Sequence, residues 1–213
     1  MTVHVAGVAI PDSEIVRKAV ARIGQEMPGV LVGHAFRVYL FAALIGRRRS
    51  LDFSDELLFV AAAFHHLGLT GRFSGSSRRF ELDSADAAID FLSPYRLSDT
   101  QAQGVWNAIA LHTTFGLGGF ESPLVELLQA GVGTDLMALH FDEIAAGDRA
   151  AVVRAYPREP AFKSLIINAL ADGIAWRPAS TFGNVTADIL ERRDPDFCRV
   201  NFCGLILGCR WEQ

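Results

Sequence analysis

Apolar residues recur every three or four positions through most of the chain, which is the spacing of one face of an α-helix. In the segment from about Val30 to Gly46, Leu31, His34, Val38 and Phe41 share one such face. Strict alternation of apolar and polar residues, which is typical of a half-buried strand, is almost absent. The pattern therefore predicts an all-α protein built as a helical bundle, and it places His34 on the side that faces the core.

Short polar residues precede most apolar stretches, and glycine or proline follows them, as expected at helix starts and stops. Helices are predicted at about 15–25, 30–46, 55–66, 85–92, 99–114, 123–140, 145–155, 160–176 and 185–192. Residues 70–79, TGRFSGSSRR, hold two glycines and four Ser or Thr, so we expect a mobile surface loop. This loop either borders an active site or is a solvated connector. The length of 213 residues suits one domain, which we expect to span residues 1–213.

Composition narrows the class of protein. Half of the residues are apolar and 21% are charged, which is the profile of a globular protein with a full core. The formal charge of -4 provides no basic surface, so no nucleic-acid partner is expected. No uninterrupted apolar run reaches the roughly 18 residues of a membrane span, and no charged leader precedes an apolar core. We therefore expect a cytoplasmic protein that does not bind membranes.

Three cysteines, Cys198, Cys203 and Cys209, lie in the tail of the sequence. Their number is odd and they form no CxxC pair, which argues against both a disulfide framework and a thiolate zinc site. We expect reduced, partly buried thiols.

The candidate chemistry centres on His65 and His66, two adjacent imidazoles at the end of an apolar predicted helix. Buried imidazoles need hydrogen-bond partners or a metal. His34, His112 and Asp135 lie in three other predicted helices whose remaining residues are mostly apolar. Nitrogen and carboxylate donors that converge from several helices are how bundles build metal sites. The alternative is that each of these residues is a core side chain satisfied by a neighbour.

Six segments carry a resemblance to a known family. They are HAFRVYLFA at 34–42, HHLGLT at 65–70, RRFELDSADAA at 78–88, VWNAIALHTT at 105–114, GVGTDL at 131–136 and TFGNVTADIL at 181–190. These segments resemble the HD-domain metal hydrolases and, within them, the cyanamide hydratase-like branch. His34, His65 and Asp135 match metal-binding positions of that family, and His112 matches the extra histidine of the branch. His66 stands where the family has the aspartate of its HD pair.

The resemblance implies a helical HD-like fold and one divalent transition metal, zinc ahead of iron or nickel. The ligands would be His34, His65, His66 and Asp135, unless the larger His66 imidazole turns aside. The implied reaction adds metal-activated water to a small nitrogen-containing substrate, such as the nitrile carbon of cyanamide, to give urea. His112 and Asp135 are the expected catalytic residues, with His112 passing a proton from outside the metal's ligand set.

Other polar residues of the matching segments have weaker claims on function. Arg37, and Arg79 together with Glu81, are expected to be ion-paired scaffold. Thr113 either orients a ligand or caps its helix, and Asn184 is expected to serve packing and turn chemistry.

Two other functions stay open. The first is an HD-type nucleotide phosphohydrolase, which is less favoured because Arg72, Arg78 and Arg79 are the only basic cluster near the motifs. The second is a catalytically altered small-molecule binding protein that lost activity when His66 replaced the aspartate. In each case the partner is a small molecule, and a homo-oligomer is compatible with the sequence.

Overall fold

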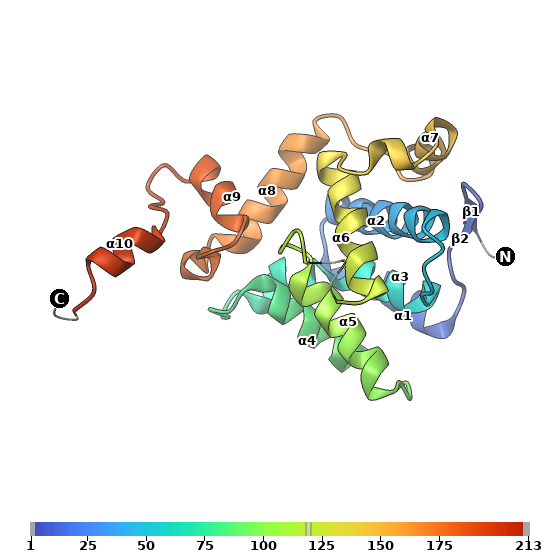
Figure 1. Cartoon of the computed structure of the whole chain (residues 1–213), viewed down its shortest axis with the longest axis horizontal. Coiled ribbons are helices and arrows are strands. Elements are labelled where there is room, and N and C mark those ends of the chain that lie inside the picture. The colour runs from blue at the N-terminus through green and yellow to red at the C-terminus, as the bar shows by residue number, and fades with distance from the viewer. Residues whose placement is uncertain (1–2, 118, 120, 211–213) are drawn as a thin grey trace.

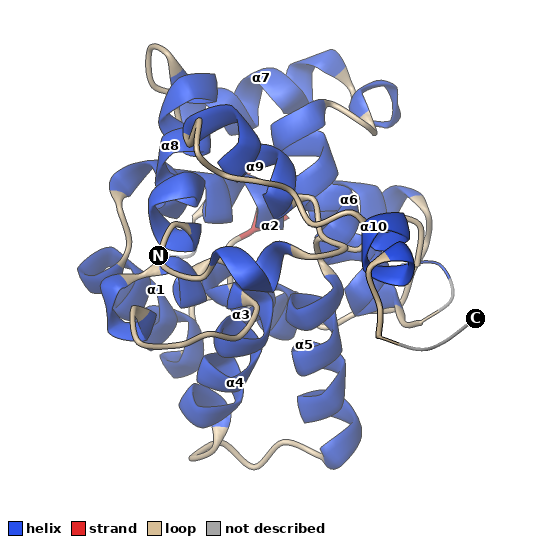
Figure 2. Ribbon diagram, turned by 90° about the vertical axis from the view of Figure 1, so that its left-hand side faces the viewer, coloured by secondary structure: helices blue, strands red, loops and turns tan. Residues whose placement is uncertain are grey.

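The computed structural model describes residues 3–117, 119 and 121–210, and most of these residues are helical. Figure 2 shows that strands are confined to one small segment of the chain. The first half contains β1 (His4–Val5), β2 (Val8–Ala9), α1 (Glu14–Glu26), α2 (Gly29–Arg48), α3 (Asp55–Phe64), α4 (Phe80–Leu92) and α5 (Asp99–Leu111). The second half contains α6 (Pro123–Met137), α7 (Ala146–Ala155), α8 (Phe162–Ile174), α9 (Thr186–Arg193) and α10 (Phe202–Leu207). Short 3-10 turns are η1 (Leu67–Leu69), η2 (Gly71–Phe73), η4 (Phe141–Glu143) and η5 (Pro178–Thr181). The predicted all-α bundle is confirmed.

Helix starts follow the capping signals of the sequence. The hydroxyl oxygens of Ser13, Ser54, Ser98 and Ser122 each accept a hydrogen bond from a backbone N–H in the first turn of α1, α3, α5 and α6. At α5, Gln101 returns a bond to the backbone of Ser98 and completes a capping box. Each such cap stabilises its helix by about 1 kcal/mol. These four starts are therefore determined by local sequence.

Helices α2 and α6 cross in the middle of the bundle, with α7 and α8 on one side and α4 and α5 on the other (Figure 1). The crossing is close because Gly131 of α6 has no side chain. A Cβ at this position would lie 2.4 Å from the carbonyl oxygen of Val38 on α2. This close approach sets His34 of α2 beside Asp135 of α6.

A second close approach positions the paired histidines. Gly68, in the turn after α3, packs against the start of α4, where an added Cβ would lie 2.2 Å from the carbonyl oxygen of Phe80. The N–H of Gly68 donates to the hydroxyl oxygen of Ser84 at 2.8 Å. His65 and His66, which immediately precede this turn, are thereby held between α3 and α4.

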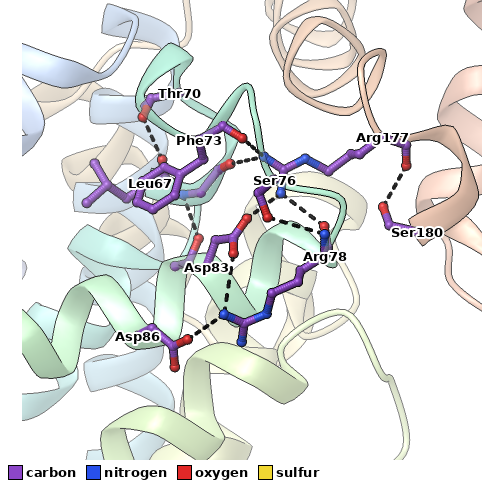
Figure 3. A network of polar contacts seen from close by, with 11 residues as sticks. Leu67, Thr70, Phe73, Ser76, Arg78, Asp83, Asp86, Arg177 and Ser180 are labelled. Atoms are coloured by element: carbon purple, nitrogen blue, oxygen red, sulfur yellow. Dashed lines mark hydrogen bonds and ion pairs between the residues drawn. The ribbon is translucent and has the colours of Figure 1, made fainter.

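The loop after η1 is anchored by a buried arginine. Arg177 donates to the carboxylate of Asp83 at 2.6 Å and to the carbonyl oxygens of Gly68, Phe73 and Arg78 at 2.9–3.0 Å (Figure 3). Its side chain is fully buried. The segment expected to be a mobile loop is therefore tied to the body of the protein through two of its own carbonyls, those of Phe73 and Arg78.

Several predicted boundaries were wrong. Helix α4 begins at Phe80 rather than near residue 85, because Phe80 is only 3% exposed and packs in the core. Helix α6 ends at Met137, because Ala138 adopts a left-handed conformation with φ of 58°. Helix α10 was not predicted; it projects from the side of the molecule opposite the strands (Figure 1), and its apolar side chains are exposed.

The cysteines also differ from the prediction. All three, Cys198, Cys203 and Cys209, are free thiols as expected, but they are exposed rather than partly buried. They flank or lie within α10, which packs against little of the chain described by the structure.

Helix α2 has the length and composition of a membrane span, although Arg37 interrupts its apolar run. It has 20 residues and a mean hydropathy of 1.6 over its most apolar window. In the fold, 67% of that window is buried against the other helices. Burial of this kind is typical of a core helix, so the structure is compatible with a soluble protein.

Candidate metal centre

Four histidines lie together in the interior. His34 comes from α2, His65 and His66 from the turn between α3 and η1, and His112 from the end of α5. None is more than 2% exposed. The ring centroids of His65 and His66 are 3.9 Å apart, both rings lie 5.2 Å from His34, and His65 lies 5.0 Å from His112. The structure therefore brings together all four imidazoles that the sequence singled out.

The hydrogen bonds of three rings fix where their protons are. The Nδ1 atoms of His65 and His112 lie 2.7 and 2.6 Å from the carbonyl oxygens three residues earlier, those of Ala62 and Ile109. A carbonyl oxygen only accepts, so both Nδ1 atoms carry the proton. In each neutral ring the Nε2 atom is then left with a bare lone pair.

His34 is held in the same way by a carboxylate. Its Nδ1 donates to Oδ2 of Asp135 at 2.6 Å. Its Nε2 lies 3.3 Å from Nε2 of His65. When both rings are neutral with the proton on Nδ1, neither nitrogen has a hydrogen to donate across that contact. A cation between them would satisfy both lone pairs.

The spacing of the donors fits a metal ion. His34, His65 and His66 each offer a nitrogen, and these three atoms lie within 4.8 Å of one another. Zinc–nitrogen distances of about 2.0–2.1 Å in tetrahedral geometry separate two nitrogen ligands by roughly 3.3 Å. The observed contact between His34 and His65 has this length. Metal-binding histidines also characteristically donate their second N–H to a carboxylate or a carbonyl, as both residues do here.

Asp135 lies behind His34 rather than facing the three imidazoles. Its two oxygens accept from Nε and Nη2 of Arg37 at 2.8 and 3.0 Å, and Arg158 lies 3.6 Å away. Burial raises the pKa of Asp135, but the hydrogen bonds and charges of His34 and Arg37 outweigh this effect and lower it to about 2. These contacts favour an ionised carboxylate that orients His34, a different role from the direct ligand that the resemblance implied.

Two ring nitrogens at the centre have no hydrogen-bond partner among the described residues. They are Nδ1 of His66 and Nε2 of His112. Burial lowers the pKa of His66 and of His65 well below the ordinary value, and the neighbouring imidazoles add to this effect. Both rings are therefore neutral at neutral pH. Unpartnered buried polar atoms are costly and rare in folded proteins, which makes these two nitrogens candidates for contact with a ligand.

His112 is linked to a second carboxylate. Burial lowers the pKa of the His112 imidazole, and the nearby Glu81 carboxylate opposes that effect. Glu81 is 1% exposed and accepts hydrogen bonds from Arg79 at 2.9 Å, from Asn184 at 2.6 Å and from the hydroxyl of Thr113. These bonds place a fixed negative charge beside His112.

A cavity of about 300 Å³ reaches two of the four histidines, His66 and His112, but neither His34 nor His65 lines it. Its polar lining includes His66, His112, Thr113, Thr186 and Asp188, and its apolar lining comprises Phe80, Phe115, Val132, Leu136, Met137, Leu170, Val185 and Ile189. Among the residues that the structure describes, no lysine or arginine lines it. No residue of the loop at 70–79 is among the described residues that line this cavity, which favours the solvated connector over a border of the site.

A larger cavity of about 490 Å³ opens on the other side of Asp135. It includes Arg158 and Lys163, and no histidine is among its described lining residues. The Arg158 guanidinium lies over the ring of Phe162, 4.3 Å from its centroid. This cavity offers positive charge, but it does not reach the imidazoles.

The other polar residues singled out in the sequence form ion pairs and hydrogen bonds around the site. Arg37, and Arg79 with Glu81, are ion-paired as expected. The hydroxyl of Thr113 donates to the carboxylate of Glu81. Asn184 serves turn chemistry by accepting from the N–H of Thr186, but it also binds Glu81, which the sequence did not predict.

Sequence reasoning missed the outer wall of the site. Leu170 on α8, and Val185 and Ile189 at α9, close the cavity that the histidines line. The only local signal was the apolar spacing of α8 and α9, which predicts a buried face without naming what that face contacts. No protein-family model matches the sequence, and no curated protein matches it either.

Proposed function

We propose that the protein is a metal-dependent hydratase or hydrolase of the HD-domain type, acting on a small nitrogen-containing substrate such as cyanamide or a nitrile. One observation carries this proposal. The bare Nε2 atoms of His34 and His65 face each other at 3.3 Å, with His66 completing a buried donor set that reaches a cavity. Such a set fits one divalent transition metal, with zinc, iron and nickel preferred because the donors are imidazoles.

His34, His65 and His66 would hold the ion, and Asp135 would keep His34 in the correct tautomer. A bound ion would polarise the substrate and make a water molecule acidic enough to ionise near neutral pH. Helices α3 and α5 end at the candidate site, with His65 and His112 as their C-cap residues. The partial negative charges of these two helix C-termini favour a cation at this position.

His112 is the residue best suited to move a proton. Its Nδ1 hydrogen is engaged by Ile109, so Nε2 is the atom that gains or loses a proton. Hydration of a nitrile forms one carbon–oxygen bond and transfers both protons of water to nitrogen, giving an amide. Burial lowers the pKa of His112, and the nearby Glu81 carboxylate partly offsets this effect, so the ring is protonated more easily than burial alone would allow.

The lining of the cavity favours this reaction over phosphate chemistry. Phosphate groups are usually bound by arginine or lysine, and neither lines the cavity among the described residues. A nucleotide phosphohydrolase is the second candidate, because Arg158 and Lys163 line the larger cavity and could bind phosphate. Arg158 is already paired with Asp135, which reduces the charge it can offer a phosphate.

Reconstitution with metal and a substrate panel tests the proposal. The purified protein is loaded with Zn²⁺, Fe²⁺ or Ni²⁺, analysed for metal, and incubated with cyanamide, acetonitrile and a set of nucleotides. We expect about one metal per chain and formation of urea or amide. His65→Ala should lose both, whereas His140→Ala, which alters a histidine that contacts Glu143 elsewhere, should keep both.

The negative results of this experiment distinguish the alternative functions. Phosphate release without hydration would favour the nucleotide phosphohydrolase. One bound metal with ligand binding but no turnover of either substrate class would favour the altered binding protein. Metal content far below one per chain after reconstitution would contradict the metal centre itself.

A further inference from the structure

We infer that the substrate carries an apolar substituent, such as a phenyl ring or a branched alkyl chain, next to its reacting carbon–nitrogen group. This inference rests on the proposed function and specifies its substrate class. It follows from the cavity that His66 and His112 share with a wall of aliphatic and aromatic side chains.

The volume of the cavity exceeds what cyanamide needs. A water molecule in the liquid occupies about 30 Å³, so the three non-hydrogen atoms of cyanamide take up a minor part of a cavity of about 300 Å³. Bound alone, cyanamide would leave most of the apolar lining in contact with water or empty space. A substrate that covers more of this lining therefore carries additional atoms.

The side chains that line the cavity determine which kind of substituent fits there. Val132 and Leu170 are 3% and 8% exposed, and Leu136 and Ile189 are partly buried. The acid on the lining, Asp188, is paired at 2.6 Å with Arg199. A charged or strongly polar substituent would lose its hydration here without gaining partners. An apolar substituent gains roughly fourfold in affinity for each methylene that it buries.

The mouth of the cavity is apolar as well. Phe115, Met137 and Val185 line the cavity and are 40%, 47% and 39% exposed. Exposed apolar side chains gathered around one opening are unusual unless they meet a ligand. They offer an entry route for an apolar molecule.

At the histidine end, two rings with unpartnered nitrogens line the cavity. The unpartnered Nδ1 of His66 and Nε2 of His112 belong to rings that are no more than 2% exposed. A substrate with one polar end and one apolar end would direct its carbon–nitrogen group to these rings and its substituent toward α8 and α9. Water then adds across the triple bond of R–C≡N to give R–CO–NH₂, without an oxidant or a reductant.

Matched nitriles and their amides test this inference on the zinc-loaded full chain. Phenylacetonitrile and acetonitrile are compared as substrates, and phenylacetamide and acetamide as ligands by calorimetry. Burial of a phenyl group predicts that phenylacetamide binds roughly 10- to 150-fold more tightly than acetamide. The same factor is expected in kcat/KM for the nitriles.

Variants of the apolar wall provide the specificity control. Ile189→Phe narrows the cavity, and Val185→Trp obstructs its exposed rim, where a larger side chain has room. Either should reduce the preference for the phenyl compounds at least tenfold while leaving metal content unchanged. Leu165→Trp, on α8 but outside this cavity and 40% exposed, should leave the preference intact.

The outcomes separate the two proposals. Equal kcat/KM for the two nitriles, unaffected by the wall variants, would overturn the inference and leave the hydratase standing. Tight, variant-sensitive binding of phenylacetamide without hydration of any nitrile would support the apolar site and refute the hydratase. Absence of binding by either amide would overturn the inference.

Discussion

Replacement of Asp135 by asparagine distinguishes an orienting carboxylate from a direct metal ligand. The substitution keeps the shape of the side chain and removes its charge. It leaves the guanidinium of Arg37, 1% exposed, without its anion, and it points an NH₂ group toward donors on Arg37 or His34. Removal of one partner of a buried ion pair typically costs 3–5 kcal/mol of unfolding free energy.

The structure places the expected loss at the lower end of that range. Arg37 keeps hydrogen bonds to the carbonyl oxygens of Tyr156 and Pro157 at 3.3 and 3.2 Å, and asparagine retains one acceptor oxygen. We therefore expect a loss of about 3 kcal/mol, or roughly 6–12 °C in Tm for a chain of this size. Metal affinity should fall about 10- to 100-fold, as for other residues that orient a ligand, with one metal still bound at saturation.

Urea unfolding of the metal-free protein and competition with a chelator measure the two quantities. Asp188→Asn is the matched control, because Asp188 pairs with Arg199 on the surface and its loss should change stability by less than about 1 kcal/mol. A variant that binds no metal even at saturating concentration would show that Asp135 is a direct ligand. Unchanged stability and affinity would refute the role derived from its contacts.

Three further predictions concern the histidines. His66→Asp should still bind one metal but shift its preference from zinc toward Mn²⁺ or Mg²⁺, measured by competitive loading; identical selectivity and turnover would place His66 away from the ion. His112→Ala should keep its metal and lose roughly 10²- to 10⁴-fold in kcat, and loss of metal would make His112 a ligand. Because burial lowers the pKa of His65, His66 and His112, the unfolded chain binds more protons below pH 6.5 than the folded one. The free energy of unfolding should therefore be independent of these groups above about pH 6.5 and should decrease as the pH is lowered below it, by up to about 4 kcal/mol per pH unit for three groups; urea unfolding of the metal-free protein measures this, and a flat profile from pH 7.5 to 5.5 would contradict it.

The amino-acid sequence by itself determined most of the helices and many of the residues that face the core. Serine caps and three-to-four spacing act within one or two turns, so Ser54 and the apolar run after it predict α3 without knowledge of the rest of the chain. The same spacing placed His34 on a buried face. The observation that buried imidazoles need partners then selected His65, His66 and His112 as candidates.

Only the tertiary structure decided how these residues meet. Whether Asp135 faces the three imidazoles or lies behind His34 depends on the crossing of α2 and α6 at Gly131. It also depends on Arg37, about 100 residues earlier in the sequence, which donates to the carboxylate of Asp135. The apolar wall at Ile189 likewise reaches His66 through the packing of α9, far along the chain. Such pairings depend on the directions in which helices pack, and local periodicity specifies which face is buried but not what that face contacts.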